Sequence, residues 1–403
     1  MEEKTTKAPL SFDLAQEFFR GHNIERWNDT IRPFPFYEID KHGHKLMIAY
    51  ILAKYEEKKG NTVDWELIIK NSIFELLRRI IISDIKSPIY AKFKENKEIF
   101  RKLNAYVFNQ VQDKIGNIKF KNEFKNFLED GTKHNTLTYR IIDAAHIYSS
   151  YWEYKIIENF NPFKHQNEQI RWEITKSIVE YSDLEGINKL LGNHSILNFI
   201  DICGQLRFQK RWAQTPRVPV TSVLGHVTLV AVFTYILSSE LNFCKKRIYN
   251  NFFGALFHDL PETVTRDIIS PVKRSSYELD NLISEIEEEL AQREILPYLE
   301  DEWQEEIKYF TQNEFANKYI EKSKIKTTKD NIDNKYNKDE FSPHDGLLIR
   351  FADHYSAYLE AYNSIVLGIS TDDLKESIKN IKQRYKNVKI CNMDISPLFK
   401  TKK

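Results

Sequence analysis

The feature that most constrains this sequence is an apolar stretch at residues 227–237, where only threonine and tyrosine interrupt aliphatic residues and phenylalanine. A helix that is apolar on every side must be surrounded by other parts of the protein. The stretch is also too short to span a bilayer, which needs about 20 residues. Only 12 glycines and 12 prolines occur among the 403 residues, so long helices are favoured over a many-stranded sheet. The sequence therefore predicts an all-α protein.

Helical spacing of apolar residues also predicts where the other helices lie. We expect helices at residues 45–55, 65–82, 139–157, 251–260 and 278–294, the last of them acidic and exposed. Residues 322–340 are rich in Lys, Asn and Asp, and we expect a solvated loop there. Pro162 and several asparagines interrupt the pattern near the middle of the chain. We therefore expect two domains, residues 1–165 and residues 166–403.

Four short matches recur in the same order in both halves. They pair Arg26-Trp27 with Arg211-Trp212, Gly43-His44 with Gly225-His226, residues 83–89 with 266–272, and residues 140–145 with 350–355. Duplication of one helical domain would produce such an order. Chance similarity is the alternative, because each match is short.

The second half holds a candidate set of metal ligands. His258 and Asp259 are adjacent at the end of an apolar run, with His226 upstream and Asp353 downstream. Two imidazoles and two carboxylates suit a divalent cation and leave positions for water and a substrate oxygen. Each residue taken singly has a plainer explanation, such as a hydrogen-bonded core histidine or a helix cap. Their position in apolar segments favours the metal site, since buried ionisable groups are costly unless paired or metal-bound.

Other residues near this set could take part in catalysis or substrate binding. Glu262 lies on the same side of a helix as the His-Asp pair, and Asp267 follows in an expected turn. An acid beside activated water can transfer protons. Arg211 and Lys273 could bind a phosphate, and Trp212 offers a flat surface to a sugar or base. Each of these residues also has a plainer explanation. The two acids could cap helices, the two basic residues could be surface charges, and the tryptophan could be part of the core.

The order His226, His258-Asp259, Asp353 resembles the H…HD…D signature of the HD-domain metal-dependent phosphohydrolases. Over residues 205–370 the sequence is similar to the bacterial HD-domain 5′-deoxynucleotidases, through Arg211-Trp212 and the run HD-x-x-E-x(4)-D-x(3)-P-V-K. The resemblance implies a cofactor, a divalent ion among Co, Mn, Fe, Ni, Zn and Mg, and assigns roles to the following residues. Its ligands would be His226, His258, Asp259 and Asp353; Glu262 and Asp267 would activate water and transfer protons; Arg211, Trp212 and, more weakly, Lys273 would bind substrate.

The sequence departs from the family pattern in two places. One lies beside the first histidine of the signature, and the other is in the N-terminal half of the chain. Gly225 and Val227 flank the first histidine where the family usually has acidic or polar residues, which puts substrate choice in doubt. If the repeats are aligned through residues 83–89, Glu75 and Leu76 take the places of the His-Asp pair, and leucine cannot bind a metal. We therefore expect two tandem HD-like domains, the first degenerate. It would serve as a packing partner or bind a regulator.

The leading hypothesis is a 5′-nucleotidase acting on (deoxy)nucleoside 5′-monophosphates. The alternatives are an HD phosphohydrolase acting on nucleoside triphosphates or cyclic nucleotides, and a nucleotide-sensing protein with a relic metal site. We expect a nucleotide as substrate and association either as a homo-oligomer or by pairing of the two halves.

Charge and cysteine content indicate which partners and which cellular compartment to expect. The 59 basic and 58 acidic residues give a net charge of +1, which provides no general basic field for nucleic acid. The three cysteines have no CxxC spacing, and the N-terminus lacks an apolar signal core. We expect a cytoplasmic protein with no membrane partner.

Overall fold

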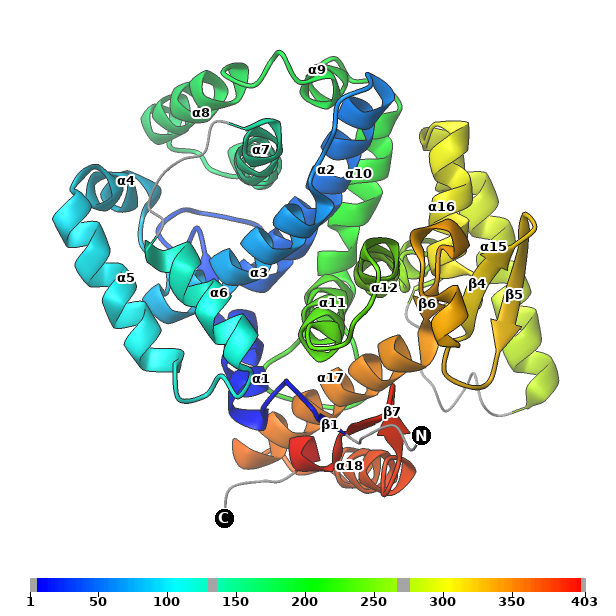
Figure 1. Cartoon of the computed structure of the whole chain (residues 1–403). Helices are drawn as coiled ribbons and strands as arrows, with labels where there is room; N and C mark the ends of the chain where they lie inside the picture. The colour runs from blue at the N-terminus through cyan, green and yellow to red at the C-terminus, as the bar shows by residue number, and fades with distance from the viewer. Residues whose placement is uncertain (1–5, 130–135, 267–275, 400–403) are drawn as a thin grey trace. The chain divides into compact units, whose positions relative to one another are not determined.

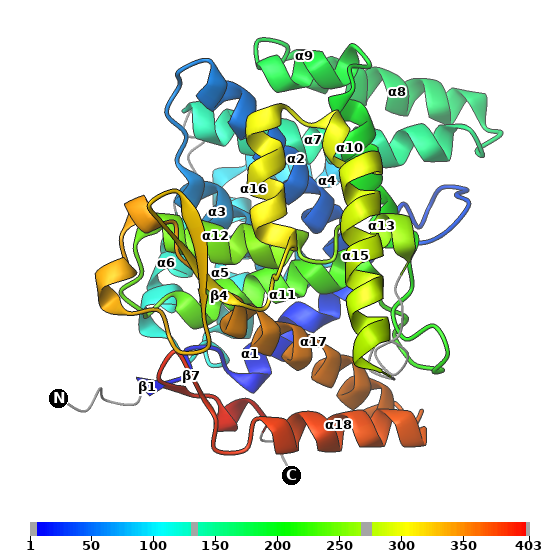
Figure 2. The same ribbon diagram turned by 90° about the vertical axis from the view of Figure 1, so that its right-hand side faces the viewer.

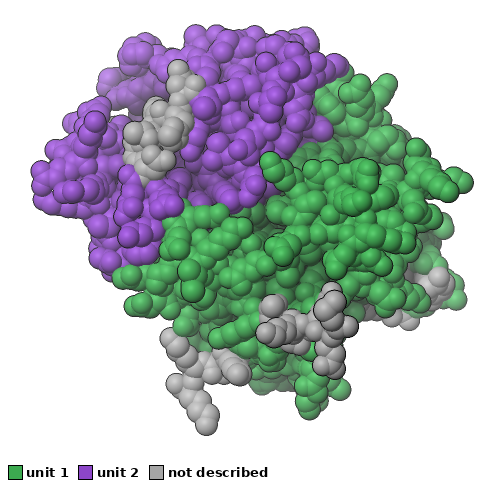
Figure 3. Space-filling model, viewed as in Figure 1, with its two compact units in different colours: residues 1–19, 111–124, 205–403 green, residues 20–110, 125–204 purple. Residues whose placement is uncertain are grey.

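The computed structural model describes residues 6–129, 136–266 and 276–399 (Figures 1 and 2). Contacts divide the chain into two compact units, coloured separately in Figure 3. Unit 1 comprises Met1–Phe19, Val111–Phe124 and Gln205–Lys403, and unit 2 comprises Arg20–Gln110 and Lys125–Gly204. Helices dominate both units, which confirms the predicted all-α class. The expected domain boundary between residues 165 and 166 stays a prediction.

Unit 1 is built around α11 (Val223–Ser238), in which every residue is buried. The hydroxyl of Ser222 caps this helix by accepting a hydrogen bond from the backbone N–H of Gly225 at 2.9 Å. Helices α12 (Lys245–Phe257) and α17 (Gly346–Val366) pack against it (Figure 1). The apolar stretch therefore forms the enclosed helix that the sequence predicts.

Shorter helices surround these three in unit 1, and Figure 2 shows α15 and α16 as neighbours joined through η3. The α-helices are α1 (Phe12–Phe19), α13 (Glu262–Thr265), α15 (Tyr277–Glu294), α16 (Asp301–Thr311) and α18 (Asp372–Arg384). The short 3-10 helices are η2 (Leu206–Phe208), η3 (Leu296–Tyr298), η4 (Asn334–Tyr336), η5 (Asp339–Phe341) and η6 (Ser396–Phe399).

Unit 1 also contains short strands. β4 (Asn317–Glu321) pairs antiparallel with β5 (Lys324–Thr328) and with β6 (His344–Asp345). β1 (Thr6–Lys7) lies parallel to β8 (Met393–Asp394), which pairs antiparallel with β7 (Lys389–Ile390). The prediction of a loop at residues 322–340 is therefore wrong in part. β5 is almost wholly exposed, so its backbone bonds to β4, rather than any apolar pattern, define it.

Unit 2 is arranged around α2 (Glu38–Lys58), which packs against α3 (Trp65–Ile82), α7 (Leu137–Glu158) and α9 (Glu185–Leu191). The bounds of α3 are those predicted from helical spacing. The remaining elements are β2 (Glu25–Arg26), β3 (Phe36–Tyr37), η1 (Arg20–Asn23), α4 (Ser87–Glu95), α5 (Lys97–Val111), α6 (Ile118–Glu129), α8 (Lys164–Val179) and α10 (Ile196–Gln205). Both α5 and α6 contribute residues to both units.

The two units repeat one another in register around α2 and α11. In unit 2, Glu25 pairs with Tyr37 in an antiparallel ladder immediately before α2. In unit 1, Lys210 pairs with Ser222 in an antiparallel bridge immediately before α11. The two pairs are separated by the same number of residues, so the repeats align here without a gap.

This register makes Lys41, not His44, the counterpart of His226. Each is the fourth residue of its helix, α2 or α11. The tryptophan fourteen residues upstream has a positive φ in both units, 56° at Trp27 and 57° at Trp212. The sequence match of Gly43-His44 with Gly225-His226 is therefore displaced by three residues, about one helical turn.

Helices α7 and α17 repeat in the same manner. Residues 145–153 and 352–360 share alanine, tyrosine, serine, tyrosine and glutamate at five of nine positions. The shared glutamates, Glu153 and Glu360, each accept a hydrogen bond from the tryptophan indole of their own unit, at 2.8 Å and 2.6 Å. The duplication is therefore visible in side-chain contacts as well as in element order.

The α7–α17 register also changes one expected correspondence. His146 takes the place of Asp353, whereas the sequence match of residues 140–145 with 350–355 had placed Asp143 there. The difference is again three residues. A shift of one helical turn leaves a similar set of side chains on the same helix face, so short apolar matches do not distinguish the two alignments.

Within the described ranges, every helix is too short or too polar to cross a membrane.

Candidate metal centre

The first ligand candidate, His226, lies in the first turn of α11 and is fully buried. Its Nδ1 is 3.0 Å from Oγ of Ser356 on α17, and its Nε2 is 2.9 Å from Oδ1 of Asp353. If Nδ1–H donates to the serine, Nε2 directs a lone pair at a carboxylate oxygen. Two acceptors at this separation repel unless a proton or a cation lies beside them.

The second pair, His258 and Asp259, follows directly after α12. Nδ1 of His258 is 2.8 Å from the carbonyl oxygen of Ala255, which can only accept, so Nδ1 carries the proton. Nε2 then holds a lone pair; it is buried, has no hydrogen-bond partner among the described residues, and lies 3.2 Å from Oδ1 of Asp259. A neutral imidazole whose other nitrogen bonds a carbonyl is the usual arrangement of a metal-binding histidine.

Three of the four predicted ligands converge, and the fourth, Asp353, contacts one of them. One ligand atom each from His226, His258 and Asp259 lies within 4.8 Å of the others. Asp353 joins them through its 2.9 Å contact with His226, and Nε2 of His226 is 3.9 Å from Oδ2 of Asp259. Ligands about 2.1 Å from one ion are about 3 Å apart when adjacent and about 4 Å apart when opposite. The residues present therefore fit a single divalent cation.

The charges of the surroundings also fit a cation. Burial alone would raise the pKa of Asp353, but the contact with His226, followed by the charges of His354 and Arg211, holds that pKa well below its ordinary value. The carboxylates of the centre outnumber its guanidinium groups by two. The carboxylates are those of Asp259, Glu262, Asp353 and Glu360, and the guanidinium groups those of Arg211 and Arg217.

The loop before α11 carries the two predicted substrate residues. Trp212 donates its indole N–H to Oε2 of Glu360 at 2.6 Å, and Nε of Arg211 lies 3.4 Å from the same carboxylate. Nη1 of Arg211 is 3.8 Å from Oδ2 of Asp259, so the guanidinium borders the metal ligands. Thr221 also donates to Glu360, at 2.7 Å. One buried carboxylate therefore positions both predicted substrate residues.

Arg217 supports this loop from within. Its guanidinium donates to the carbonyl oxygens of Pro219 and Arg211, each at 3.0 Å. Burial would raise the pKa of Glu360, but the charges of Arg211 and Arg217 hold it well below the ordinary value. Glu360 is therefore ionised and accepts hydrogen bonds without needing a proton.

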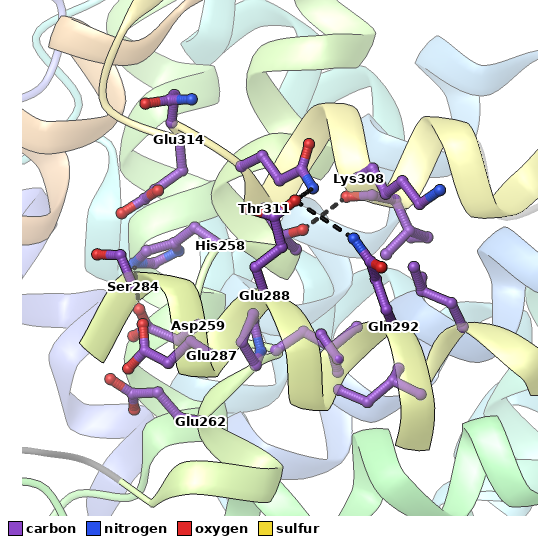
Figure 4. A pocket seen from close by; sticks show the side chains of 18 of the residues that line it. His258, Asp259, Glu262, Ser284, Glu287, Glu288, Gln292, Lys308, Thr311 and Glu314 are labelled. Atoms are coloured by element: carbon purple, nitrogen blue, oxygen red, sulfur yellow. Dashed lines mark hydrogen bonds and ion pairs between the residues drawn. The ribbon is translucent and has the colours of Figure 1, made fainter. Parts of the chain in front are cut away.

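A cavity of about 360 Å³ opens beside the centre, within the range of small-molecule sites. Figure 4 shows His258, Asp259, Glu262, Ser284, Glu287 and Glu314 at one end, and Glu288, Gln292, Lys308 and Thr311 at the other. Most of the charged lining residues are acidic, from α15 and the segments around α13 and α16. Burial raises the pKa of Glu314. The predicted proton-transfer residue Glu262 thus lies in the cavity wall.

Two predicted residues, Asp267 and Lys273, lie outside the described residues. The sequence interpretation missed Ser356, Glu360 and Arg217, which orient the ligands and the substrate loop. A comparison of α7 with α17 over nine residues would have singled out the serine and the glutamate, since both recur. Arg217 recurs as well, because the pattern Arg-Trp-x-x-Thr-x-Arg occurs at residues 26–32 and 211–217. Extending the Arg-Trp match by five residues would therefore have singled it out.

Comparison with known families agrees with this geometry. Residues 203–382 match the family described as HD domain. Residues 16–187 match the family described as 5′-deoxynucleotidase YfbR-like. No curated protein and no solved structure matches the chain.

The fold and the site define a metal-dependent phosphohydrolase with an HD domain. We place the chain in the HD-domain superfamily, with a YfbR-like N-terminal half and the candidate metal centre in the C-terminal half. Both halves therefore carry HD-type sequence, as the duplication predicts.

Proposed function

We propose that this protein is a 5′-nucleotidase, which hydrolyses (deoxy)nucleoside 5′-monophosphates to nucleoside and phosphate. The observation that carries the proposal is the cluster of His226, His258 and Asp259, with Asp353 in contact with His226. Of these residues, His258 and Asp259 line an open cavity. A divalent cation bound there would lower the pKa of a water molecule and withdraw electron density from a phosphoryl oxygen.

The protein side chains would orient the substrate and move protons. Arg211, fixed by Glu360, presents its guanidinium beside the ligands, where it can bind two phosphate oxygens. Glu262 can accept a proton from the attacking water or return one to the leaving alkoxide. Trp212, held through its indole N–H, offers its ring to the sugar. Asp267 and Lys273 keep the proton-transfer and phosphate-binding roles that the family resemblance implies.

The charge of the cavity favours a monophosphate over a triphosphate. Lys308 is its one lysine or arginine among the described lining residues, against a majority of carboxylates. A triphosphate chain extending into this cavity would be repelled, since like charges raise the energy of binding. A base with amino groups, in contrast, can donate hydrogen bonds to carboxylates such as Glu287 or Glu288.

The test combines metal analysis with a phosphate-release assay over nucleoside mono- and triphosphates. The wild-type protein should hold one divalent ion and release orthophosphate from monophosphates. Asp259→Ala should lose both the metal and turnover, by at least about 10³-fold in kcat/KM. Asp372→Ala, at a fully exposed site on α18, is the control. Persistent phosphate release in Asp259→Ala would show that the centre is elsewhere.

Product identity decides between the proposal and its alternatives. Orthophosphate plus nucleoside supports the 5′-nucleotidase. Inorganic triphosphate, or a linear monophosphate from a cyclic nucleotide, would instead indicate another HD phosphohydrolase. Nucleotide binding with no turnover of any of these compounds in the metal-loaded protein would indicate a sensor.

A further inference from the structure

The repeat places an ammonium group where unit 1 has a metal ligand. Lys41 occupies the position of His226, and its Nζ lies 2.9 Å from Nδ1 of His146, the counterpart of Asp353. In unit 1 the corresponding atoms, Nε2 of His226 and Oδ1 of Asp353, are also 2.9 Å apart. The geometry of the pair is kept, while its chemistry changes from two metal ligands to a donor and an acceptor.

The His-Asp pair has also been replaced. Ser83 and Arg266 end their helices with positive φ values of 59° and 64°, which fixes the alignment after α3 and α13. Glu75 then stands in place of His258, and its Oε1 is 3.5 Å from Nδ1 of His146. Its other oxygen accepts a hydrogen bond from Lys45. In unit 2, therefore, contacts between oppositely charged side chains join these positions, whereas in unit 1 a shared cation could join them.

A third replacement puts a positively charged side chain where unit 1 has a negatively charged one. In the same alignment Arg79 takes the place of Glu262, the predicted proton-transfer acid of unit 1. Nε of Arg79 lies 3.4 Å from Glu38, which also accepts a 2.8 Å hydrogen bond from Arg26. Arg26 is the counterpart of the predicted phosphate ligand Arg211. Arg79 thus adds a guanidinium group at a position where unit 1 has the carboxylate of Glu262.

The centre of unit 2 lacks the excess of carboxylates that unit 1 offers to a dication. Its acidic side chains are paired with basic ones. The bases include Arg26, Lys41, Lys45 and Arg79, and the acids include Glu38, Glu75, Asp84 and Glu153. Burial, followed by the charge of Arg26, holds the pKa of Lys41 well below its ordinary value. A bound anion would favour the protonated form of Lys41, whereas a bound cation would disfavour it.

The centre of unit 2 is exposed to solvent at His146 and Glu75, whereas Arg26, Lys41 and Arg79 are buried. The side chains of His146 and Glu75 are 37% and 15% exposed. Those of Asp353 and Asp259 in unit 1 are 18% and 16% exposed. A small ligand can therefore approach the centre from the side of His146.

We propose that unit 2 holds a metal-independent site for a phosphate or phosphate monoester, formed by Arg26, Lys41, Arg79 and His146. Arg26 and Arg79 supply the positive charge that a metal would supply in unit 1, and the amine of Lys41 is a further hydrogen-bond donor. The site binds without hydrolysis, because Lys41 and Leu76 replace two of the metal ligands of unit 1 and Arg79 replaces the acid Glu262. This inference does not depend on the substrate proposed for unit 1.

Calorimetry with inorganic phosphate tests the site on the full-length chain. Asp259→Ala removes the metal of unit 1, and a chelator removes any residual ion. One phosphate per chain should still bind to this background. Adding Lys41→Met, which replaces a buried ammonium with an apolar group of similar length, should weaken binding at least about tenfold. Lys102→Met, 71% exposed on α5, is the matched control and should bind as the background does.

A second variant tests the same site in case the first variant does not fold. His146→Gln, at the more exposed position, should also weaken phosphate binding, with an unchanged far-ultraviolet circular dichroism spectrum. Absence of phosphate binding without metal, or equal affinity in folded Lys41→Met and His146→Gln, would overturn the proposal. So would metal analysis that finds a second divalent ion, lost in His146→Gln, in the wild-type protein.

Discussion

Trp212 donates its indole N–H to Glu360, across 148 positions of sequence, at 2.6 Å. The acceptor is fully buried on α17, and the donor lies in the loop that leads into α11. The contact holds the loop that carries Arg211 against the helix that carries Asp353. A buried, ionised carboxylate makes strong hydrogen bonds, so the loop geometry is set before any substrate binds.

Glu360→Gln should loosen this loop while keeping the shape of the side chain. The amide cannot stabilise the charge of Arg211, so we expect KM for a nucleoside monophosphate to rise about tenfold, with a smaller change in kcat. Steady-state kinetics and metal content measure the effect. Glu376→Gln on exposed α18 is the control. An equal loss in kcat with unchanged KM would contradict a positioning role.

Arg211→Lys tests the phosphate contact itself. Lysine keeps the charge but not the planar fork that binds two oxygens, so we expect KM to rise about tenfold and metal content to stay at the wild-type level. Arg384→Lys, exposed at the end of α18, provides the comparison. If the two variants have the same KM, Arg211 does not bind the phosphate.

Ser222→Ala removes the cap of α11 and should lower the free energy of unfolding by about 1 kcal/mol. Because His226 lies in the first turn, we also expect weaker metal binding, measured by competition with a chelator. Thr371→Ala removes the corresponding cap of α18, where Thr371 accepts from Leu374 N–H at 3.4 Å. That variant should lose stability alone. A similar loss of metal affinity in both would mean that the cap has no specific effect on the centre.

His42 should make unit 2 sensitive to acid. It is buried beside Glu38, with Lys45 and Glu75 nearby, and burial lowers its pKa from 6.5 to about 4. The unfolded chain binds a proton near pH 6.5, and the folded chain only near pH 4. The stability contributed by the neutral form is therefore complete above pH 6.5 and is lost as the pH falls to about 4. The loss should be up to about 3 kcal/mol.

His42→Leu should flatten this dependence in urea unfolding curves measured between pH 7 and pH 4. His165→Leu, at an exposed position on α8, should keep the wild-type slope. Parallel profiles for wild type and His42→Leu would show that other groups cause the acid sensitivity.

Much of the fold follows from local pattern. The enclosed helix α11 and the bounds of α3 were predictable, because apolar periodicity reports burial directly. β5 was not, because an exposed strand is defined by its hydrogen bonds to β4 and leaves no apolar signal. The register of the duplication was also missed at His44 and Asp143, each by one helical turn.

The sequence by itself determined the helical class, the duplication and the identity of the metal-ligand candidates, since these depend on residue type and spacing. Only the tertiary structure decided that Lys41 faces His146 and that Glu360 positions the substrate loop. Those relationships join residues more than 100 positions apart. Spacing along the chain cannot specify them, because the packing of α2 on α7, and of α11 on α17, fixes which turns meet.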